Sequence, residues 1–120
     1  MIAGIGTDLV EIYRIKEMLL RGRGLLRIFT TTELACAKDN ATTLAGNFAV
    51  KEAVSKVFGT GFFGVEPYEI EVLRNEAGAP YVKLYGNADK LAKDQKITKI
   101  HVSITNTQEF AQAFAIGECV

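Results

Sequence analysis

The sequence is poor in the residues and runs that mark several large classes of protein. It has one histidine and two cysteines, Cys36 and Cys119, whose positions do not have metal-ligand spacing, so it offers no zinc site. No apolar run approaches the roughly 20 residues that cross a bilayer, and the N-terminus lacks the features of a secretory signal. Fourteen basic residues balance 14 acidic ones, which argues against a general nucleic-acid-binding protein. We therefore expect a cytoplasmic protein with reduced, packed cysteines, and neither a nucleic acid nor a membrane as its partner.

What is present fits one folded domain. Hydrophobic residues make up 48% of the 120 residues and charged residues 23%, which is ordinary globular usage. A chain of this length has room for one core. No repeat, low-complexity tract or proline-rich linker divides it, so we expect a single domain over residues 1–120.

The order of predicted elements favours the α+β class over a doubly wound parallel sheet. The strongest helix prediction covers residues 42–58 and ends at Gly59, and the spacing of Thr30 and Glu33 predicts a capping box at the start of another helix. Alternating residues predict strands. The expected elements, in order, are a strand over 4–11, a helix over 12–20, the capped helix after Thr30, the long helix, a hairpin of 68–74 with 80–86, a short helix near 87, and paired strands over 99–105 and 109–117.

Asp8 raises a question because it interrupts a strand-like run. Alternate positions place it on the face of Val10 and Ile12, while Thr7 and Leu9 point the other way. Aspartate is depleted in strands. A carboxylate on an apolar face must be paired, bound to a cation or reached by water.

Glu52 and Lys56 stand one helical turn apart, away from the apolar stripe of the long helix. The simple interpretation is an ion pair between residues i and i+4 on a solvated face, and such pairs are common. With Asp8 the two side chains would form a minimal Mg²⁺ and phosphate site, since Mg²⁺ takes one or two protein carboxylates. No sequence rule, however, places Asp8 beside Glu52.

Three other features leave alternatives open. The pattern from Gly59 to Gly64 matches G-x-G-x-x-G but follows a predicted helix, so a helix cap fits better than a dinucleotide site. Residues 14–27 hold five basic and one acidic side chain, either a solvated surface or a docking surface for an acidic partner. The last strand has a small-residue face that could meet a helix of this chain or a partner subunit, formed by Ala111, Ala113 and Ala115.

Four stretches together resemble bacterial holo-acyl carrier protein synthases, the small type of 4′-phosphopantetheinyl transferase. They are "GIGTDLVEIYRI", "RIFTTTEL", "LAGNFAVKEAVSKVFGTG" and "HVSIT", and they occur in the family's order over nearly the whole chain. The resemblance implies an α+β domain with a mostly antiparallel sheet and a long central helix. It also implies a homotrimer with active sites between protomers, which would give the alanine face a partner subunit.

The same resemblance implies a reaction and its residues. The enzyme would transfer 4′-phosphopantetheine from coenzyme A to a serine of apo-acyl carrier protein, release 3′,5′-ADP and support fatty acid biosynthesis. Asp8 and Glu52 match magnesium ligands, and Lys56 matches the lysine beside the coenzyme A pyrophosphate. The remaining matches are Ser55, Gly59 and Thr107 in coenzyme A-binding segments, and Arg14 and Arg21 on the helix that docks the carrier protein.

Two positions depart from the family pattern. Asn47 stands where members commonly have arginine, and Asn106 where they have histidine; asparagine can donate hydrogen bonds but brings no charge. We therefore expect altered coenzyme A affinity with the reaction intact. The alternatives are a non-catalytic module that binds a carrier protein or nucleotide, and a Mg²⁺-dependent pyrophosphate hydrolase.

Overall fold

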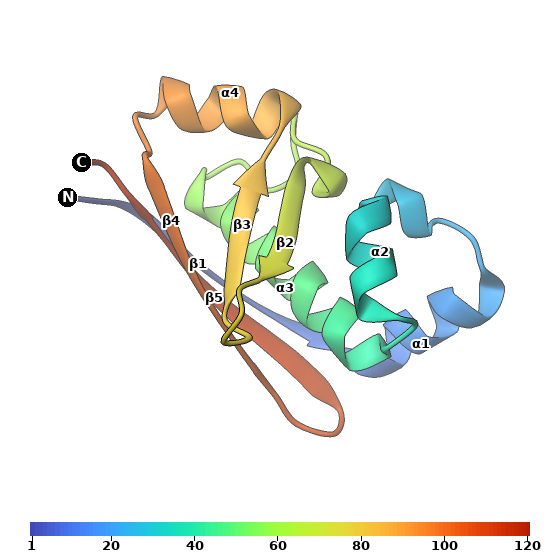
Figure 1. The fold of residues 1–120 in the computed structure, drawn as a ribbon. Coiled ribbons are helices and arrows are strands. Elements are labelled where there is room, and N and C mark those ends of the chain that lie inside the picture. The colour runs from blue at the N-terminus through green and yellow to red at the C-terminus, as the bar shows by residue number, and fades with distance from the viewer.

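Two antiparallel sheets pack around one long helix (Figure 1). The computed structural model describes residues 1–120. In the larger sheet, β1 (Ile2–Glu11) and β4 (Lys99–Asn106) both pair with β5 (Phe110–Glu118), which lies between them. The smaller sheet is the hairpin of β2 (Ile70–Arg74) and β3 (Pro80–Leu84). The α+β class is confirmed, and all the strands pair in antiparallel fashion.

The helices agree closely with the predicted ranges. They are α1 (Ile12–Arg21), α2 (Thr31–Ala37), α3 (Ala41–Val57) and α4 (Gly86–Asp94), with short 3₁₀ turns η1 (Leu25–Arg27) and η2 (Pro67–Glu69) between them. The capping box is present, because the Thr30 hydroxyl accepts from the Glu33 N–H and the Glu33 side chain accepts from the Thr30 N–H. No helix is long and apolar enough to span a bilayer.

Small residues let α3 lie very close to the larger sheet. The three alanines of the β5 face are at most 1% exposed, and Ala45, Ala49 and Ala53 of α3 are fully buried in the same core. On β1, a Cβ added at Gly6 would collide with the backbone oxygen of Ala53. The implied partner subunit on the alanine face is therefore wrong, because α3 of the same chain covers it.

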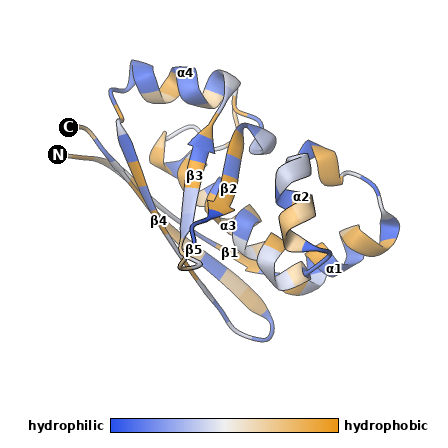
Figure 2. Cartoon of the chain, in the orientation of Figure 1, coloured by the Kyte–Doolittle hydropathy of each residue, from blue (hydrophilic) through white to orange (hydrophobic).

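The other face of the larger sheet is open. Along β1 and β4 exposed residues alternate with residues that are half-buried or buried, and Figure 2 shows the corresponding alternation of hydropathy along β4. The open face carries large apolar side chains: Ile5 is 60% exposed, Leu9 58% and Phe114 45%.

A buried ion pair joins α2, α3 and β2, and the sequence did not suggest it. The Lys51 ammonium is fully buried and donates to Glu33 Oε1 at 2.7 Å and to the carbonyl oxygens of Ile70 and Pro67 at 2.6 and 3.1 Å. The other oxygen of Glu33 accepts from the Val72 N–H. All three ammonium donors are used, so this cluster is structural.

One minor prediction needs correction. Cys36 and Cys119 are both free, as expected, but Cys36 is exposed rather than packed. The loop after α3 anchors Phe62 against the core, whereas Phe63 is 87% exposed and does not anchor anything. Cys36 lies in the last turn of α2 and Phe63 in the turn after α3, and both side chains are exposed there.

Candidate active site

Asp8 lies on the side of β1 that faces α3. Gly6 and Val10 are buried on that side while Leu9 is exposed on the other, so the alternation predicted for the strand is confirmed. The Asp8 side chain is 14% exposed, at the rim of the interface rather than inside the core. Gly6 allows this approach, since any side chain there would hold β1 away from α3.

Lys56 reaches across from α3 to β1. Its ammonium donates to the Thr7 carbonyl oxygen at 2.8 Å and to Asp8 Oδ1 at 3.3 Å. It forms no ion pair with Glu52, so the interpretation as a solvated pair within the helix is wrong. An ammonium has three donors. Lys56, whose side chain is 52% exposed, therefore keeps one donor for a ligand.

Glu52 completes a pair of facing carboxylates. Burial raises the pKa of Glu52 from its ordinary value of 4.5, and the charge of Asp8 and a side-chain hydrogen bond with it raise this pKa further. The positive charges of Lys56 and Arg14 act in the opposite direction. Two carboxylates that repel each other at a partly buried position form a site that a cation would stabilise.

The donor set fits Mg²⁺. No group of three or more histidine, cysteine or acidic side chains is positioned to hold a metal ion, so the carboxylates gathered at this place are the pair Asp8 and Glu52. Magnesium prefers oxygen ligands and is commonly bound by one or two carboxylates together with substrate phosphates. Structural zinc, by contrast, needs four protein ligands with nitrogen or sulfur among them.

Of the predicted coenzyme A residues other than Lys56, only Gly59 presents an open surface, at the end of α3. Gly59 follows α3 with a φ of 80°, and a Cβ there would meet no atom within 4 Å. Ser55 is 2% exposed and its hydroxyl donates to the Glu52 carbonyl oxygen at 2.6 Å, so it shapes the turn of helix that carries Glu52. It is not open to a ligand in this chain, because its hydroxyl is already bonded inside the helix.

Thr107 is not close to the carboxylate pair. Asp8 is opposite Ala113 on β5, and Thr107 lies beyond Phe110 in the turn that joins β4 to β5. Ala113 and Phe110 are three residues apart along β5, which corresponds to about 10 Å. The Thr107 hydroxyl accepts from the N–H groups of Glu109 and Phe110, so it fixes the turn.

The two arginines of α1 border a cavity of about 300 Å³, whose wall on β1 is Val10, two residues beyond Asp8. Arg14 is close enough to affect the pKa of Glu52, a proximity that the sequence did not indicate. Arg21 lies at the C-terminal end of α1, and its guanidinium pairs with the Glu17 carboxylate at 3.5 Å. The apolar floor of the cavity comes from β1, α1, the residue that follows η1, and α3, and it includes Val10, Ile15, Met18, Ile28 and Phe48.

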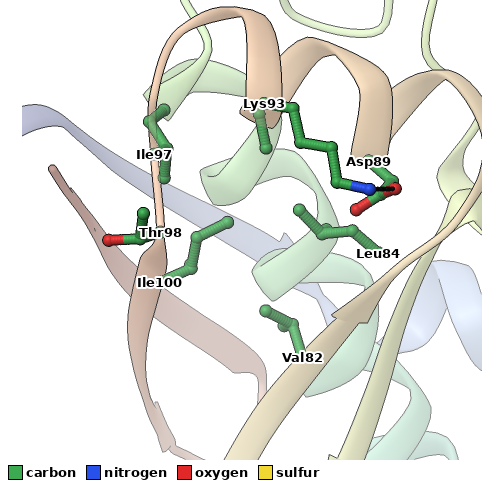
Figure 3. A pocket seen from close by; sticks show the side chains of 8 residues that line it. Val82, Leu84, Asp89, Lys93, Ile97, Thr98 and Ile100 are labelled. Carbon is green, nitrogen blue, oxygen red and sulfur yellow. Dashed lines mark ion pairs between the residues drawn. The ribbon is translucent and has the colours of Figure 1, made fainter. Parts of the chain in front are cut away.

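A cavity of about 390 Å³ between β3, α4 and β4 is separate from this site (Figure 3). Its walls are mostly apolar, and its polar side chains are Thr98 and the Asp89–Lys93 pair, which closes on itself at 2.9 Å. It contains none of the predicted site residues. Because its two charged side chains pair with each other, this cavity has no unpaired charge to bind a ligand.

Comparison with known proteins is consistent with the site. A model of the 4′-phosphopantetheinyl transferase superfamily matches residues 4–117. The holo-[acyl-carrier-protein] synthase of Lachnoclostridium phytofermentans is 52% identical over 120 residues, which are 100% of this chain and 98% of that protein.

Solved structures of the same kind of enzyme share the fold. The Helicobacter pylori holo-[acyl-carrier-protein] synthase in complex with coenzyme A has a TM-score of 0.86 at 28% identity, over 95% of this chain and 99% of the other. The Bacillus anthracis synthase in complex with coenzyme A (3′,5′-ADP) has a TM-score of 0.82 at 34% identity, over 100% and 99%. The likeness thus extends over nearly the entire molecule.

Proposed function

The chain belongs to the 4′-phosphopantetheinyl transferase superfamily, and we propose that it transfers 4′-phosphopantetheine from coenzyme A to a serine of apo-acyl carrier protein. The serine oxygen forms a bond to the β-phosphorus, and the bond from that phosphorus to the oxygen leading to 3′,5′-ADP breaks. The serine proton passes to a carboxylate at the site. The observation that carries this proposal is the meeting of Asp8, Glu52 and Lys56 from β1 and α3.

Asp8 and Glu52 are the residues that would hold Mg²⁺. When bound, the ion offsets negative charge on the pyrophosphate as the bond breaks. Without a cation the two carboxylates would repel an approaching phosphate, so their facing geometry suits a metal-dependent reaction better than a metal-free one.

Lys56 orients the nucleotide. Its bonds to the Thr7 carbonyl oxygen and Asp8 fix the ammonium at the mouth of the site, and its remaining donor can bind a phosphate oxygen. Phosphoryl transfer depends mainly on positioning and electrostatics, so few protein groups suffice. We propose contacts with coenzyme A for Gly59 and Thr107 as well, while Ser55 supports Glu52 from inside the helix.

The carrier protein would dock on α1. Arg14 and Arg21 border a cavity with an apolar floor, a combination that suits an acidic helix with an apolar side chain at its centre. Arg14 is also near Glu52, so docking there would bring the acceptor serine to the carboxylates. We place this activity in the cytoplasm, in fatty acid biosynthesis, and the two free cysteines suit that reducing compartment.

Three copies would assemble through the open face of the larger sheet. Ile5, Leu9 and Phe114 expose apolar surface there that no element of this chain covers, and contiguous apolar patches of this kind mark interfaces. Active sites between protomers would also bring Thr107 of one copy to the carboxylates of another, which one chain alone does not do.

The first experiment is intact-mass analysis of an apo-acyl carrier protein incubated with this protein, coenzyme A and Mg²⁺, with EDTA as control. We expect a gain of one phosphopantetheine group, which EDTA prevents. Glu52→Gln should nearly abolish the gain, whereas Asp94→Asn, which neutralises an exposed carboxylate on α4, should not.

Other outcomes identify the alternatives. Coenzyme A binding with no transfer at saturating Mg²⁺ would mean a binding module. Release of 3′,5′-ADP without a carrier protein would mean pyrophosphate hydrolysis. Unchanged transfer by Glu52→Gln would contradict the metal-ligand assignment.

A further inference from the structure

The cavity between β3, α4 and β4 has apolar walls and takes no part in the proposed reaction (Figure 3). It measures about 390 Å³, and five of its eight lining residues are apolar. They are Val82 and Leu84 of β3, Ala92 of α4, Ile97 in the turn after α4, and Ile100 of β4. A volume of this size lies within the range of small-molecule sites, which is about 300–1,000 Å³.

The cavity exists because β3 and β4 are the edges of different sheets. The two strands lie next to each other but are not paired by hydrogen bonds, and α4 spans the gap above them (Figure 1). The buried residues of α4 are two alanines, Ala88 and Ala92. Their short side chains do not fill the space between the two sheet edges, so it stays open.

Both ends of α4 are fixed by hydrogen bonds to other elements. At its start, the N–H of Asn87 donates to Glu69 Oε2 at 2.7 Å. Just after its end, the Gln95 side chain donates to the Phe58 carbonyl oxygen at 2.9 Å. These bonds keep the helix from moving down onto the sheets, so the cavity is a lasting part of the fold.

The polar side chains at this cavity are directed to other partners. Asp89 and Lys93, its two charged residues, pair with each other at 2.9 Å. The Thr98 hydroxyl donates to the Glu118 carbonyl oxygen at 3.3 Å, and Figure 3 shows its oxygen pointing away from the other labelled side chains. A polar group inside would lose its bonds to water and find no replacement. The interior therefore suits an apolar group.

The walls would gain from such an occupant. Val82, Leu84 and Ile100 are only half-buried, so part of their apolar surface still meets water, and covering it is favourable. A volume of about 390 Å³ equals that of roughly a dozen water molecules, and a methylene group is about as large as one water. Because the cavity is open on one side, a chain of about eight to ten carbon atoms would fill it.

We propose that this cavity binds the alkyl chain of an uncharged amphiphile, such as a fatty alcohol, with the polar end at the mouth beside Asp89 and Lys93. These two side chains are 42% and 77% exposed, so they mark the solvent side. A charged end group fits less well, because it must keep its water and so holds the first methylene groups outside. The site is independent of the proposed transfer reaction.

Methyl NMR of the full chain, titrated with octanol, provides the first test. We expect the methyl signals of Ile97 and Ile100 to shift along one saturable curve. Ile104 is the internal control, because it lies further along β4 against Gly46 and should not respond. Octanoate should bind more weakly by roughly 4-fold or more, the effect of one methylene group. Absence of a saturable shift overturns the site, and tighter binding of octanoate overturns the uncharged class.

The length of the alcohol provides a second test. From butanol upward, each methylene group should tighten binding by roughly 2- to 4-fold. The gain should stop near about ten carbon atoms, when the cavity is full. Leu84→Ala removes wall atoms, so the limit should move up by about three carbon atoms. Leu91→Ala, at a half-buried residue of α4 outside the cavity, should keep the wild-type limit. An unchanged limit in Leu84→Ala, or an equal change in both variants, contradicts the site.

Val82→Phe tests the site by filling it. Val82 points into the cavity from β3, and phenylalanine is well tolerated in strands (Figure 3). We expect octanol to bind roughly 10-fold more weakly or worse, because the ring takes the place of several methylene groups. Wild-type affinity in a folded Val82→Phe variant overturns the proposal. Should this variant fail to fold, the chain-length limit of Leu84→Ala decides the question.

Discussion

At the scale of single residues, Glu52 and Lys51 show how neighbouring positions on one helix serve different ends. Lys51 is fully buried with every ammonium donor bonded, and it holds α2, α3 and β2 together. Glu52, the next residue, points to the rim, where its partner is another carboxylate. A buried charged group whose hydrogen bonds are all made indicates a structural role. Two like charges held together at the rim of the core indicate a site for a ligand.

The carboxylate pair makes stability depend on pH in metal-free protein. Because the pKa of Glu52 is raised in the folded state, its contribution to the free energy of unfolding is fully present below the ordinary value of 4.5 and is lost as the pH rises through the raised value. Glu52→Gln stays neutral. We therefore expect the Tm of this variant relative to the wild type, in EDTA, to increase between about pH 5 and about pH 8.

Thermal melts with the Asp94→Asn control measure this effect. Added Mg²⁺ should raise the Tm of the wild type at the higher pH and leave Glu52→Gln unaffected, since only a species that binds the ion is stabilised by it. A difference in Tm that does not change with pH would show that the pKa of Glu52 is not raised in the folded protein.

At the scale of elements, the spacing between β1 and α3 sets the site. Gly6 lies against the backbone of Ala53, which cannot rotate away, so Gly6→Ala must push the strand from the helix. We expect a loss of roughly 1–3 kcal/mol or more in the free energy of unfolding. Asp8 would also move away from Glu52, so transfer should fall more than the stability loss alone explains.

Gly46→Ala is the matched control for this change. A Cβ at position 46 would lie 3.1 Å from Ile104 Cγ2, a side-chain atom that can shift. Alanine also favours the helix by up to about 1 kcal/mol over glycine. Urea unfolding should therefore find Gly46→Ala close to the wild type, and equal losses for the two variants would contradict the argument from close packing.

At the scale of the whole molecule, the open sheet face determines assembly. Leu9→Arg places a charge on this face at a residue of β1 that is 58% exposed, and we expect it to convert the proposed trimer to monomers. Tyr68→Arg, at a position 45% exposed in η2, is the control and should keep the wild-type mass. Light scattering coupled to size-exclusion chromatography distinguishes these results.

Two outcomes would count against the proposed interface. If the wild type is monomeric, the trimer itself is wrong. If Leu9→Arg remains a trimer, the copies meet through another surface. Loss of transfer together with loss of assembly would support active sites that lie between protomers.

Local sequence determined most of the elements of this protein. Period-two alternation and the capping box gave the strands and α2 because neighbouring residues alone fix those patterns. The residue types at Asp8, Glu52 and Lys56 likewise suggested cation and phosphate binding, beside the simpler interpretation of an ion pair within the helix. Neither kind of inference depends on which segments meet.

Only the tertiary structure decided the contacts between distant segments. That β1 pairs with β5, that α3 covers the alanine face, and that Lys56 bonds to Asp8 rather than Glu52 all involve residues far apart in the chain. Periodicity tells which side of an element is apolar, but the burial of backbone and side chains against each other selects the partner, and that selection is a property of the whole fold.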